Sequence, residues 1–317
     1  MAHKLILLLL SSSIFLSCLY SEDLRRKSRK NKSLQGGTVN HETYIPANGI
    51  LKSGTFHIKQ SWAEIKNYDR PVHVKVPNGD GPFPVYIALH GRGGTGARKL
   101  KNLNKMTGRI IIAPDGYDKG WSQKRPDVDF IRQIIAYIKT CNIADGSNIA
   151  IHGSSNGAGL LYRLMIELEE DTFHHGIASI GGLGTNRYDG TNFLWDPKGG
   201  NQLKTPIVPV KGRRWLQING TEDQIVPYSG GVGTLGLEFL PAQDTFYTWA
   251  VHMGETGPKL LDSEGRPHPQ NDKLKVYEYL NGNFKHIKAV GYKHGVSGKE
   301  IKAIIHDFIS QPPISKI

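Results

Sequence analysis

The chain has 317 residues, of which 38% are hydrophobic, and a formal net charge of +12. This length and composition suit a single α/β unit with a full hydrophobic core, and they exclude a repeat array, a coiled coil and a low-complexity protein. The sequence has no nucleic-acid-binding fingerprint, and its aromatic and basic residues are not interleaved in a stripe. We therefore expect no nucleic-acid partner despite the basic charge.

Residues 1–21 have the features of a secretory signal peptide: a short basic start, an apolar stretch and small residues after it. The stretch is short for a bilayer span. Leu16-Ser17-Cys18 resembles a relaxed bacterial lipoprotein cleavage site, at which Cys18 would become lipidated and tether the protein to a membrane. The alternative is a cysteine within an ordinary signal peptide. We therefore expect a protein that is secreted or attached to the cell envelope.

Residues 22–48 are expected to form a basic flexible linker, because 25–32 read RRKSRKNK. We favour a solvated linker over a segment that binds an anionic surface. Residues 49–317 would then form one domain. If the signal is removed, Cys141 is the only remaining cysteine, so no internal disulfide can form. We expect Cys141 to be a small buried side chain.

Strand-like and helix-like segments alternate through this domain. The expected strands are 71–77, 84–90, 109–114, 149–153, 176–180, 214–219, 275–280 and 286–290. The expected helices are 128–138, 158–167, 242–253 and 299–309. Such alternation predicts an α/β fold with a mostly parallel, doubly wound sheet and helices on both faces. Sheets of this kind place their sites at the carboxyl ends of the strands.

The frame Gly153-x-Ser155-x-Gly157 lies between the strand 149–153 and the helix that follows. This is the context of a nucleophile elbow, in which a serine sits on a sharp turn at the end of a strand. Glycines on both sides permit the turn, because they have no Cβ atom. A surface serine on an ordinary strand-to-helix turn is the alternative, and the rest of the chain decides between them.

An acid and a base follow at later strand ends, in the order that α/β-hydrolases use. Asp223 lies in the loop after the strand 214–219, where Glu222 is its competitor. His294 follows the last expected strand, and His286, within that strand, is its rival. Ser155, Asp223 and His294 are spaced roughly 70 residues apart, which suits this order.

The stretch His90-Gly-Arg-Gly-Gly94 follows a buried strand and is the candidate oxyanion hole. Its glycines let the backbone turn N–H groups inward, so the amides of Arg92 and Asn156 could hold an oxyanion. The alternative is a phosphate-binding glycine loop, but no Gly-Lys-Ser/Thr follows it.

Two tryptophans are candidates for substrate binding. Trp121 lies near a strand end, and Trp195 lies in a long loop near the expected rim of the cleft. For Trp195, simple packing of the loop is an equal alternative. The pair His174-His175 lacks a third ligand at a sensible spacing, so we expect no metal site.

Several motifs occur together in a characteristic order. They are Leu89-His-Gly-Arg-Gly-Gly94, Ala113-Pro-Asp-Gly-Tyr117, Gly153-Ser-Ser-Asn-Gly157, Asn219-Gly-Thr-Glu-Asp-Gln-Ile-Val-Pro-Tyr228 and Gly291-Tyr-Lys-His294. This set resembles the polyhydroxybutyrate-depolymerase-like esterases of the α/β-hydrolase superfamily, a group that includes feruloyl and acetylxylan esterases. The likeness covers roughly residues 50–310 and is more specific than any single motif.

The resemblance implies an α/β-hydrolase fold for residues 49–317 and a secreted serine carboxyl-ester hydrolase without a metal or organic cofactor. It makes Ser155 the nucleophile, Asp223 the acid and His294 the base. The acid loop begins with Asn219 where the family usually has histidine, and the histidine loop lacks the family's Trp-Pro-Gly. These departures bear on the substrate more than on the chemistry.

We therefore expect acyl-enzyme chemistry on an ester: a polyester, or an acylated polysaccharide or its fragments. A peptidase, a thioesterase or an acyltransferase on the same fold is one alternative. A non-catalytic surface protein that binds carbohydrate is another.

Overall fold

The computed structural model describes residues 49–122, 126–197 and 202–314. The chain divides into two units, Met1–Glu42 and Thr43–Ile317, and the fold below is that of the second. The expected signal peptide 1–21, Cys18 and the linker 22–48 lie outside the described residues.

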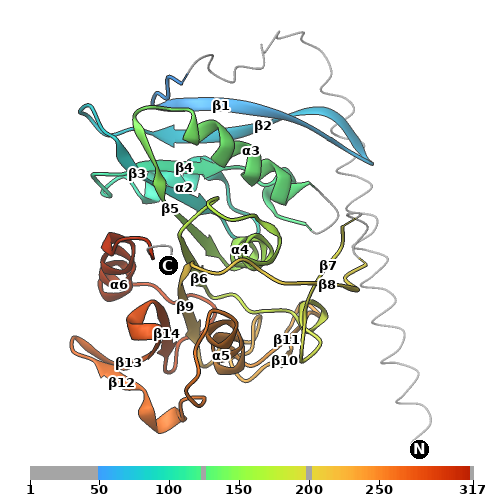
Figure 1. The fold of residues 1–317 in the computed structure, drawn as a ribbon, viewed down its shortest axis with the longest axis vertical. Coiled ribbons are helices and arrows are strands. Elements are labelled where there is room, and N and C mark those ends of the chain that lie inside the picture. Colours follow the sequence, from blue (N-terminus) through green and yellow to red (C-terminus); the bar gives the residue numbers. More distant parts are fainter. Residues whose placement is uncertain (1–48, 123–125, 198–201, 315–317) are drawn as a thin grey trace, which may run out of the picture. The chain divides into compact units, whose positions relative to one another are not determined.

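A ten-stranded sheet runs through the domain in the order β1-β2-β4-β3-β5-β6-β9-β14-β13-β12 (Figure 1). The strands from β4 to β14 in this order are parallel, while the pairs at both edges are antiparallel. Their bounds are β1 (Gly54–Trp62), β2 (Ile65–Lys75), β3 (Phe83–Leu89), β4 (Ile110–Pro114), β5 (Ala144–Ser154), β6 (His175–Ser179), β9 (Arg214–Gly220), β12 (Arg266–His268), β13 (Asn271–Tyr279) and β14 (Phe284–Ala289).

Helices cover both faces of this sheet, as predicted. They are α2 (Gly96–Asn102), α3 (Asp127–Lys139), α4 (Asn156–Glu167), α5 (Ala242–His252) and α6 (Lys299–Ser310). Two small sheets, β7 (Phe193–Trp195) with β8 (Thr205–Ile207) and β10 (Gly231–Val232) with β11 (Glu238–Phe239), and the 3-10 turns Tyr117–Lys119, Thr185–Arg187, Asp262–Glu264 and Leu280–Gly282 complete the domain.

Successive side chains along each strand point to opposite faces of the sheet, so the hydrophobic core has two halves, one on each face. Ile87 and Leu89 of β3 join the half that contains α3, α4 and α5, whereas Tyr86 and Ala88 join the half that contains α6. Figure 1 shows α6 on one side of β6 and β9, and α4 and α5 on the other. Both faces of the central strands are therefore buried, which explains their nearly continuous apolar sequences.

Besides the short strands β7, β8, β10, β11 and β12, which were not expected, two longer elements differ from the sequence-based expectation. The strand β1 was not expected, although Phe56, Ile58 and Trp62 point inward at a period of two. It pairs with β2, which begins at Ile65 rather than at residue 71. The helix α2 was also missed, because its seven residues carry no apolar stripe and its beginning is marked only by the Thr95 N-cap.

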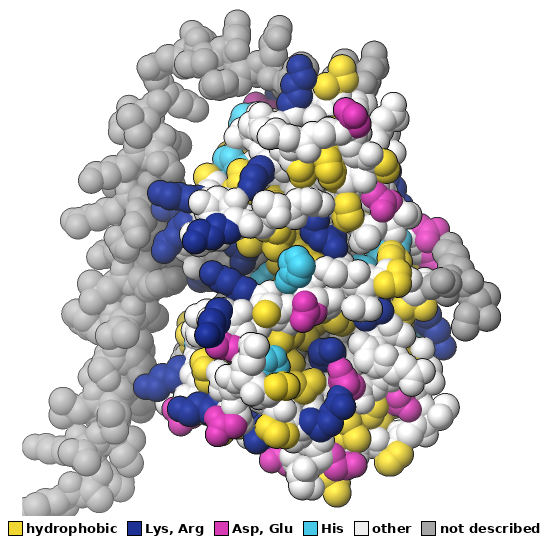
Figure 2. Space-filling model, turned by 90° about the vertical axis from the view of Figure 1, so that its left-hand side faces the viewer, with side chains coloured by type: hydrophobic (Ala, Val, Ile, Leu, Met, Phe, Trp, Pro, Cys, Tyr) yellow, Lys and Arg dark blue, Asp and Glu magenta, His cyan; other side chains and the backbone are white. Residues whose placement is uncertain are grey.

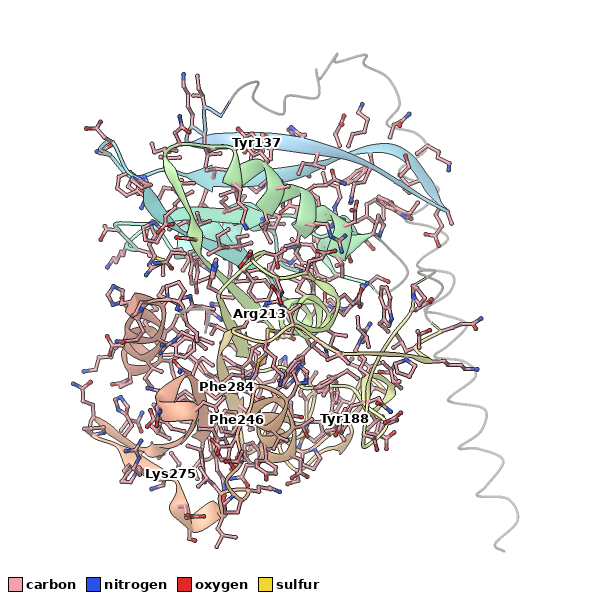
Figure 3. All side chains as sticks on the ribbon, in the orientation of Figure 1. Tyr137, Tyr188, Arg213, Phe246, Lys275 and Phe284 are labelled. Carbon is pink, nitrogen blue, oxygen red and sulfur yellow. The ribbon has the colours of Figure 1, made fainter. Side chains whose placement is uncertain are left out.

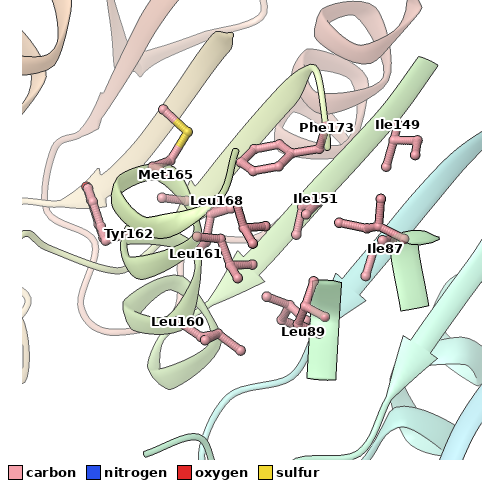
Figure 4. Packing of buried hydrophobic residues seen from close by; sticks show 14 of the residues in the cluster. Ile87, Leu89, Ile149, Ile151, Leu160, Leu161, Tyr162, Met165, Leu168 and Phe173 are labelled. Atoms are coloured by element: carbon pink, nitrogen blue, oxygen red, sulfur yellow. The ribbon is translucent and has the colours of Figure 1, made fainter. Parts of the chain in front are cut away.

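The helix α4 is held firmly behind the serine turn. Leu160, Leu161 and Leu168 pack toward β3 and β5 (Figure 4). At the other end of α4, Arg213, labelled in Figure 3, donates hydrogen bonds to the carbonyl oxygens of residues 164, 165, 168 and 169. These bonds supply donors to carbonyl groups at the end of α4 and just beyond it, where backbone partners run out.

Cys141 is buried, as predicted. Figure 2 shows basic and acidic side chains mixed with hydrophobic ones on one face of the molecule. Among the helices of the described residues, none has both the length and the apolar character needed to span a membrane.

Candidate active site

Ser155 sits on a strained turn between β5 and α4. Its φ of 53° and ψ of −117° lie outside the usual regions for a residue with a side chain. A Cβ atom on Gly153 would lie 2.3 Å from the carbonyl oxygen of Gly157, and one on Gly157 would lie 2.6 Å from that of Leu89. Both glycines are therefore required by close backbone contacts, and the turn has the geometry expected of a nucleophile elbow.

The structure brings Ser155, His294 and Asp223 together in one hydrogen-bonded chain. Ser155 Oγ lies 2.7 Å from His294 Nε2, and His294 Nδ1 lies 2.7 Å from Asp223 Oδ2. Asp223 is buried, and its Oδ1 accepts hydrogen bonds from the amides of Ile225 and Val226 at 2.9 and 3.0 Å. These two donors fix the carboxylate, so its other oxygen faces the imidazole.

The loops that carry the acid and the base are tied to each other. The amide of Glu222 donates to the carbonyl oxygen of Tyr292 at 2.9 Å, and that of Gly291 donates to Thr221 Oγ1 at 2.8 Å. A Cβ atom on Gly220 would lie 2.3 Å from the Tyr292 oxygen. Glycine at this position therefore lets the two loops approach closely enough for the imidazole and the carboxylate to meet.

The rival residues lie elsewhere. His286 is fully buried in β14, where its Nε2 lies 3.0 Å from the Tyr228 hydroxyl, and burial lowers its pKa to about 3. Glu222 is exposed, and the hydrogen bond to His294 is made by Asp223. The geometry therefore favours Asp223 and His294 over both competitors.

The amides of Arg92 and Asn156 are the candidate oxyanion hole. Within the described part of the chain these two amides donate to no protein acceptor, whereas those of Gly93 and Gly94 donate to Lys119 and Gly91. A Cβ atom on Gly91 would lie 3.4 Å from Ser155 Cβ, so this loop runs directly beside the serine. Donors fixed in this way need no reorganisation when charge develops.

Three side chains lock the loop and the helix start together. Asn156 Oδ1 accepts from the Trp121 amide at 2.7 Å, and its Nδ2 donates to the Trp121 carbonyl at 3.1 Å. Trp121 Nε1 donates to the His90 carbonyl at 2.8 Å. His90 Nε2 accepts from the Gly116 amide at 2.9 Å, which places the ring proton on Nδ1, beside the Gly91 carbonyl. Burial lowers the pKa of His90, so this neutral form is favoured.

A cavity of about 530 Å³ adjoins these amides. It is lined by residues of α4 up to Arg163, by Gly182 and residues 184–187, by residues 236–239, which include β11, and by Arg92, Trp121 and Ser122. Trp121 lines this cavity, and its role in substrate binding stays a prediction. Trp195 does not line the cavity; it pairs with Thr205 and packs against the core, so packing of its loop is the better explanation.

The charged wall of this cavity, which includes Arg163 and Arg187, was not predicted from the sequence. Arg163 and Glu167 are spaced as an i, i+4 pair, a signal that was available. The third member, Arg187, comes from a separate segment, and nothing in its local sequence marks it.

His174 and His175 form hydrogen bonds with backbone groups of the fold. His174 Nδ1 accepts from the Ile149 amide at 3.2 Å, and His175 Nε2 lies 3.0 Å from the Gln311 carbonyl oxygen. Across the residues that the structure describes, no cluster of three or more His, Cys, Asp or Glu side chains is placed to hold a metal ion.

No protein-family model matches the sequence, and no curated protein matches it. Among solved structures, an acetyl xylan esterase from Aspergillus awamori is similar, with a TM-score of 0.56 and 16% identity over 81% of this chain and 99% of that one. A poly(3-hydroxybutyrate) depolymerase from Bordetella parapertussis has a TM-score of 0.42 and 16% identity over 56% of this chain and 68% of its own.

Esterase 2 from Thermogutta terrifontis has a TM-score of 0.46 and 12% identity, over 84% of this chain and 92% of that one. The likeness to the acetyl xylan esterase confirms that this chain has the α/β-hydrolase fold. Its structural neighbours are esterases and hydrolases of that fold.

Proposed function

We propose that this protein is a serine carboxyl-ester hydrolase that works through an acyl-enzyme. The observation that carries this proposal is the hydrogen-bonded chain from Ser155 Oγ through His294 to the buried Asp223, with the serine on a turn of positive φ. A surface serine on an ordinary turn would need neither the strained backbone nor the imidazole at 2.7 Å. The α/β-hydrolase fold and the free amides beside Ser155 agree with this function.

Acylation begins with His294. Its Nε2 takes the proton of Ser155 Oγ while that oxygen attacks the ester carbonyl. Asp223 holds the imidazole with its proton on Nδ1 and stabilises the imidazolium. The amides of Arg92 and Asn156 donate to the oxyanion, and a single donor of this kind contributes about 3 kcal/mol. The alcohol then leaves with the proton from His294.

Deacylation uses the same groups. Nε2 of His294 takes a proton from water, the water oxygen attacks the acyl carbonyl, and the tetrahedral intermediate again lies against the two amides. Collapse returns the proton to Ser155 Oγ and releases the acid.

Hydrolysis of a short-chain p-nitrophenyl ester by wild type, Ser155→Ala and Ser154→Ala tests this proposal. We expect kcat to fall by about 10⁴-fold or more for Ser155→Ala. Ser154 is a matched neighbour whose Oγ accepts from Lys99 Nζ at 2.7 Å rather than from a histidine. Its variant should keep the hydrolysis far above that of Ser155→Ala. Equal activity of Ser155→Ala and wild type would refute the assignment.

We also propose export to the cell envelope or beyond, based on the sequence of residues 1–21. Lipidation of Cys18 is tested by expressing the full chain with radiolabelled fatty acid, beside Cys18→Ala. Incorporation that depends on Cys18 supports a lipid anchor, and its absence from both proteins indicates an ordinary signal peptide.

A further inference from the structure

The cavity beside the candidate oxyanion amides has a basic wall. Arg92, Arg163 and Arg187 line it, and Glu238 is the one acidic lining residue among those described. Glu238 is exposed and accepts a hydrogen bond from Thr185 Oγ1 at 3.0 Å. Water screens the exposed Arg92 as it screens this exposed carboxylate, so Arg163 and Arg187, which are little exposed, determine the charge that a bound group meets.

Two of these arginines share one carboxylate beneath the cavity. Arg163 Nε and Arg187 Nη1 each lie 3.1 Å from Glu167 Oε1. The exposed fractions of the three side chains are only 12%, 5% and 11%. Two cations therefore face one anion in poorly hydrated surroundings, and within the described parts of the chain one positive charge has no ion-pair partner of its own. Such a charge is costly to bury unless a ligand compensates it.

Arg187 has N–H donors that no protein acceptor among the described residues uses. Arg163 uses Nε, Nη1 and Nη2 for Glu167 and the Ser122 carbonyl oxygen. Among the described residues, Arg187 donates through Nη1 alone, and its Nε and Nη2 are not sealed from solvent. Burial first, and then the neighbouring Arg163, lower the pKa of Arg187 to about 10, which leaves it charged at neutral pH.

We infer that this cavity selects esters that carry a free carboxylate, and that Arg187 is the residue that recognises it. The inference rests on the proposed function, because the carboxylate belongs to the ester held at Ser155. A planar guanidinium binds a carboxylate through two parallel hydrogen bonds. A neutral substituent in the same place would leave the positive charge uncompensated. The carboxylate can belong to the acyl part or to the alcohol part of the ester.

Two pairs of esters distinguish these sources. For the acyl part, 4-nitrophenyl hydrogen adipate is compared with 4-nitrophenyl methyl adipate. For the alcohol part, 4-carboxyphenyl acetate is compared with its methyl ester. We expect kcat/KM to be about tenfold or more higher for the anionic member of one pair, as charge-assisted hydrogen bonds allow. This preference should shrink at high salt.

Variants assign the preference to one residue. Arg187→Gln should bring the ratio of anionic to neutral kcat/KM close to one, and Arg187→Lys should restore part of it. Arg187→Gln leaves Arg163 and Glu167 as a one-to-one pair, so we expect it to fold. Arg132→Gln removes the same charge on α3, where Arg132 pairs with Glu169 away from the cavity, and should keep the wild-type ratio.

A ratio near one in both pairs for wild type would overturn the inference, as would an equal loss in Arg132→Gln. Binding to Ser155→Ala, measured by calorimetry, separates a missing carboxylate site from failure of the proposed function. The anionic probes are 4-carboxyphenyl acetate and monomethyl adipate, and each is compared with its neutral methyl ester. Tighter binding of an anionic probe, lost on adding Arg187→Gln, supports the carboxylate site even if no ester is hydrolysed. Equal binding of the anionic and neutral members of both pairs refutes it.

Discussion

Replacing Asp223 by asparagine tests how the acid acts on His294. The amides of Ile225 and Val226 donate to Asp223 Oδ1, so the asparagine will keep its oxygen there and turn its NH₂ toward His294 Nδ1. Nδ1 must then accept, and the ring proton moves to Nε2, which faces Ser155 Oγ. The imidazole can no longer take the serine proton.

The expected loss is about 10⁴-fold in kcat, with KM little changed, as for a triad histidine in the wrong tautomer. This corresponds to about 5 kcal/mol in the barrier. The free energy of unfolding should hardly change, because both backbone hydrogen bonds survive. Asp223→Ala provides the contrast: it removes the acceptor of the Ile225 and Val226 amides, and leaving the buried Val226 amide unpaired alone costs about 1–3 kcal/mol.

The assay is steady-state hydrolysis of a p-nitrophenyl ester, with urea unfolding of each variant. Glu222→Gln is the matched control, because Glu222 is the exposed neighbour and the hydrogen bond to His294 Nδ1 is made by Asp223. A kcat for Asp223→Asn within tenfold of wild type, or an equal loss in Glu222→Gln, would refute the reasoning.

Three further predictions concern the scaffold. Gly157→Ala should abolish soluble, active protein, because the added Cβ would lie 2.6 Å from two carbonyl oxygens. Gly159→Ala should instead raise the free energy of unfolding by about 0.5–1 kcal/mol, because its Cβ would have nothing within 4 Å. Equal stabilities of the two variants would contradict this. Arg70→Met should lower the free energy of unfolding, measured in urea, by about 3–5 kcal/mol, because it removes the ion-pair partner of the fully buried Asp127, 2.8 Å away. The double variant Arg70→Met with Asp127→Leu should recover most of this loss. No recovery would count against a stabilising role for the pair. Burial lowers the pKa of His286 from 6.5 to about 3, so between these pH values the unfolded chain binds a proton that the folded chain excludes. The free energy of unfolding should therefore receive the full contribution of His286 above about pH 6.5 and fall as the pH drops toward 3. His286→Gln should reduce the slope of the free energy of unfolding against pH by about one proton, and an unchanged slope would refute this.

Much of the candidate site was predictable because its residues are tied to strand ends. A buried strand followed by a glycine-flanked serine specifies a turn locally, so Ser155 and its two glycines could be recognised from the sequence. Asp223 and His294 follow β9 and β14, which are neighbours in the sheet. Because parallel strands end at one edge, loops about 70 residues apart in sequence meet there.

The cavity wall could not be predicted in this way. Arg187 reaches Glu167 from a 3-10 turn after β6, and its position depends on the path of the loop rather than on a local pattern. Trp195 shows another limit: an aromatic residue in a long loop suggested a binding site, whereas the segment forms β7 and the partly buried side chain packs against the core. Periodicity was sufficient for α3, α4 and α6, whose apolar stripes face the sheet, but not for α2.

The most direct test of the central claim is to identify the residue that a fluorophosphonate labels. Peptide mapping with fragmentation can distinguish Ser155 from the adjacent Ser154. We predict one adduct, on Ser155 Oγ, which forms quickly in wild type and is lost or greatly slowed in His294→Ala. A label on another residue, or no label on a folded protein, would contradict the claim that Ser155 is an activated nucleophile.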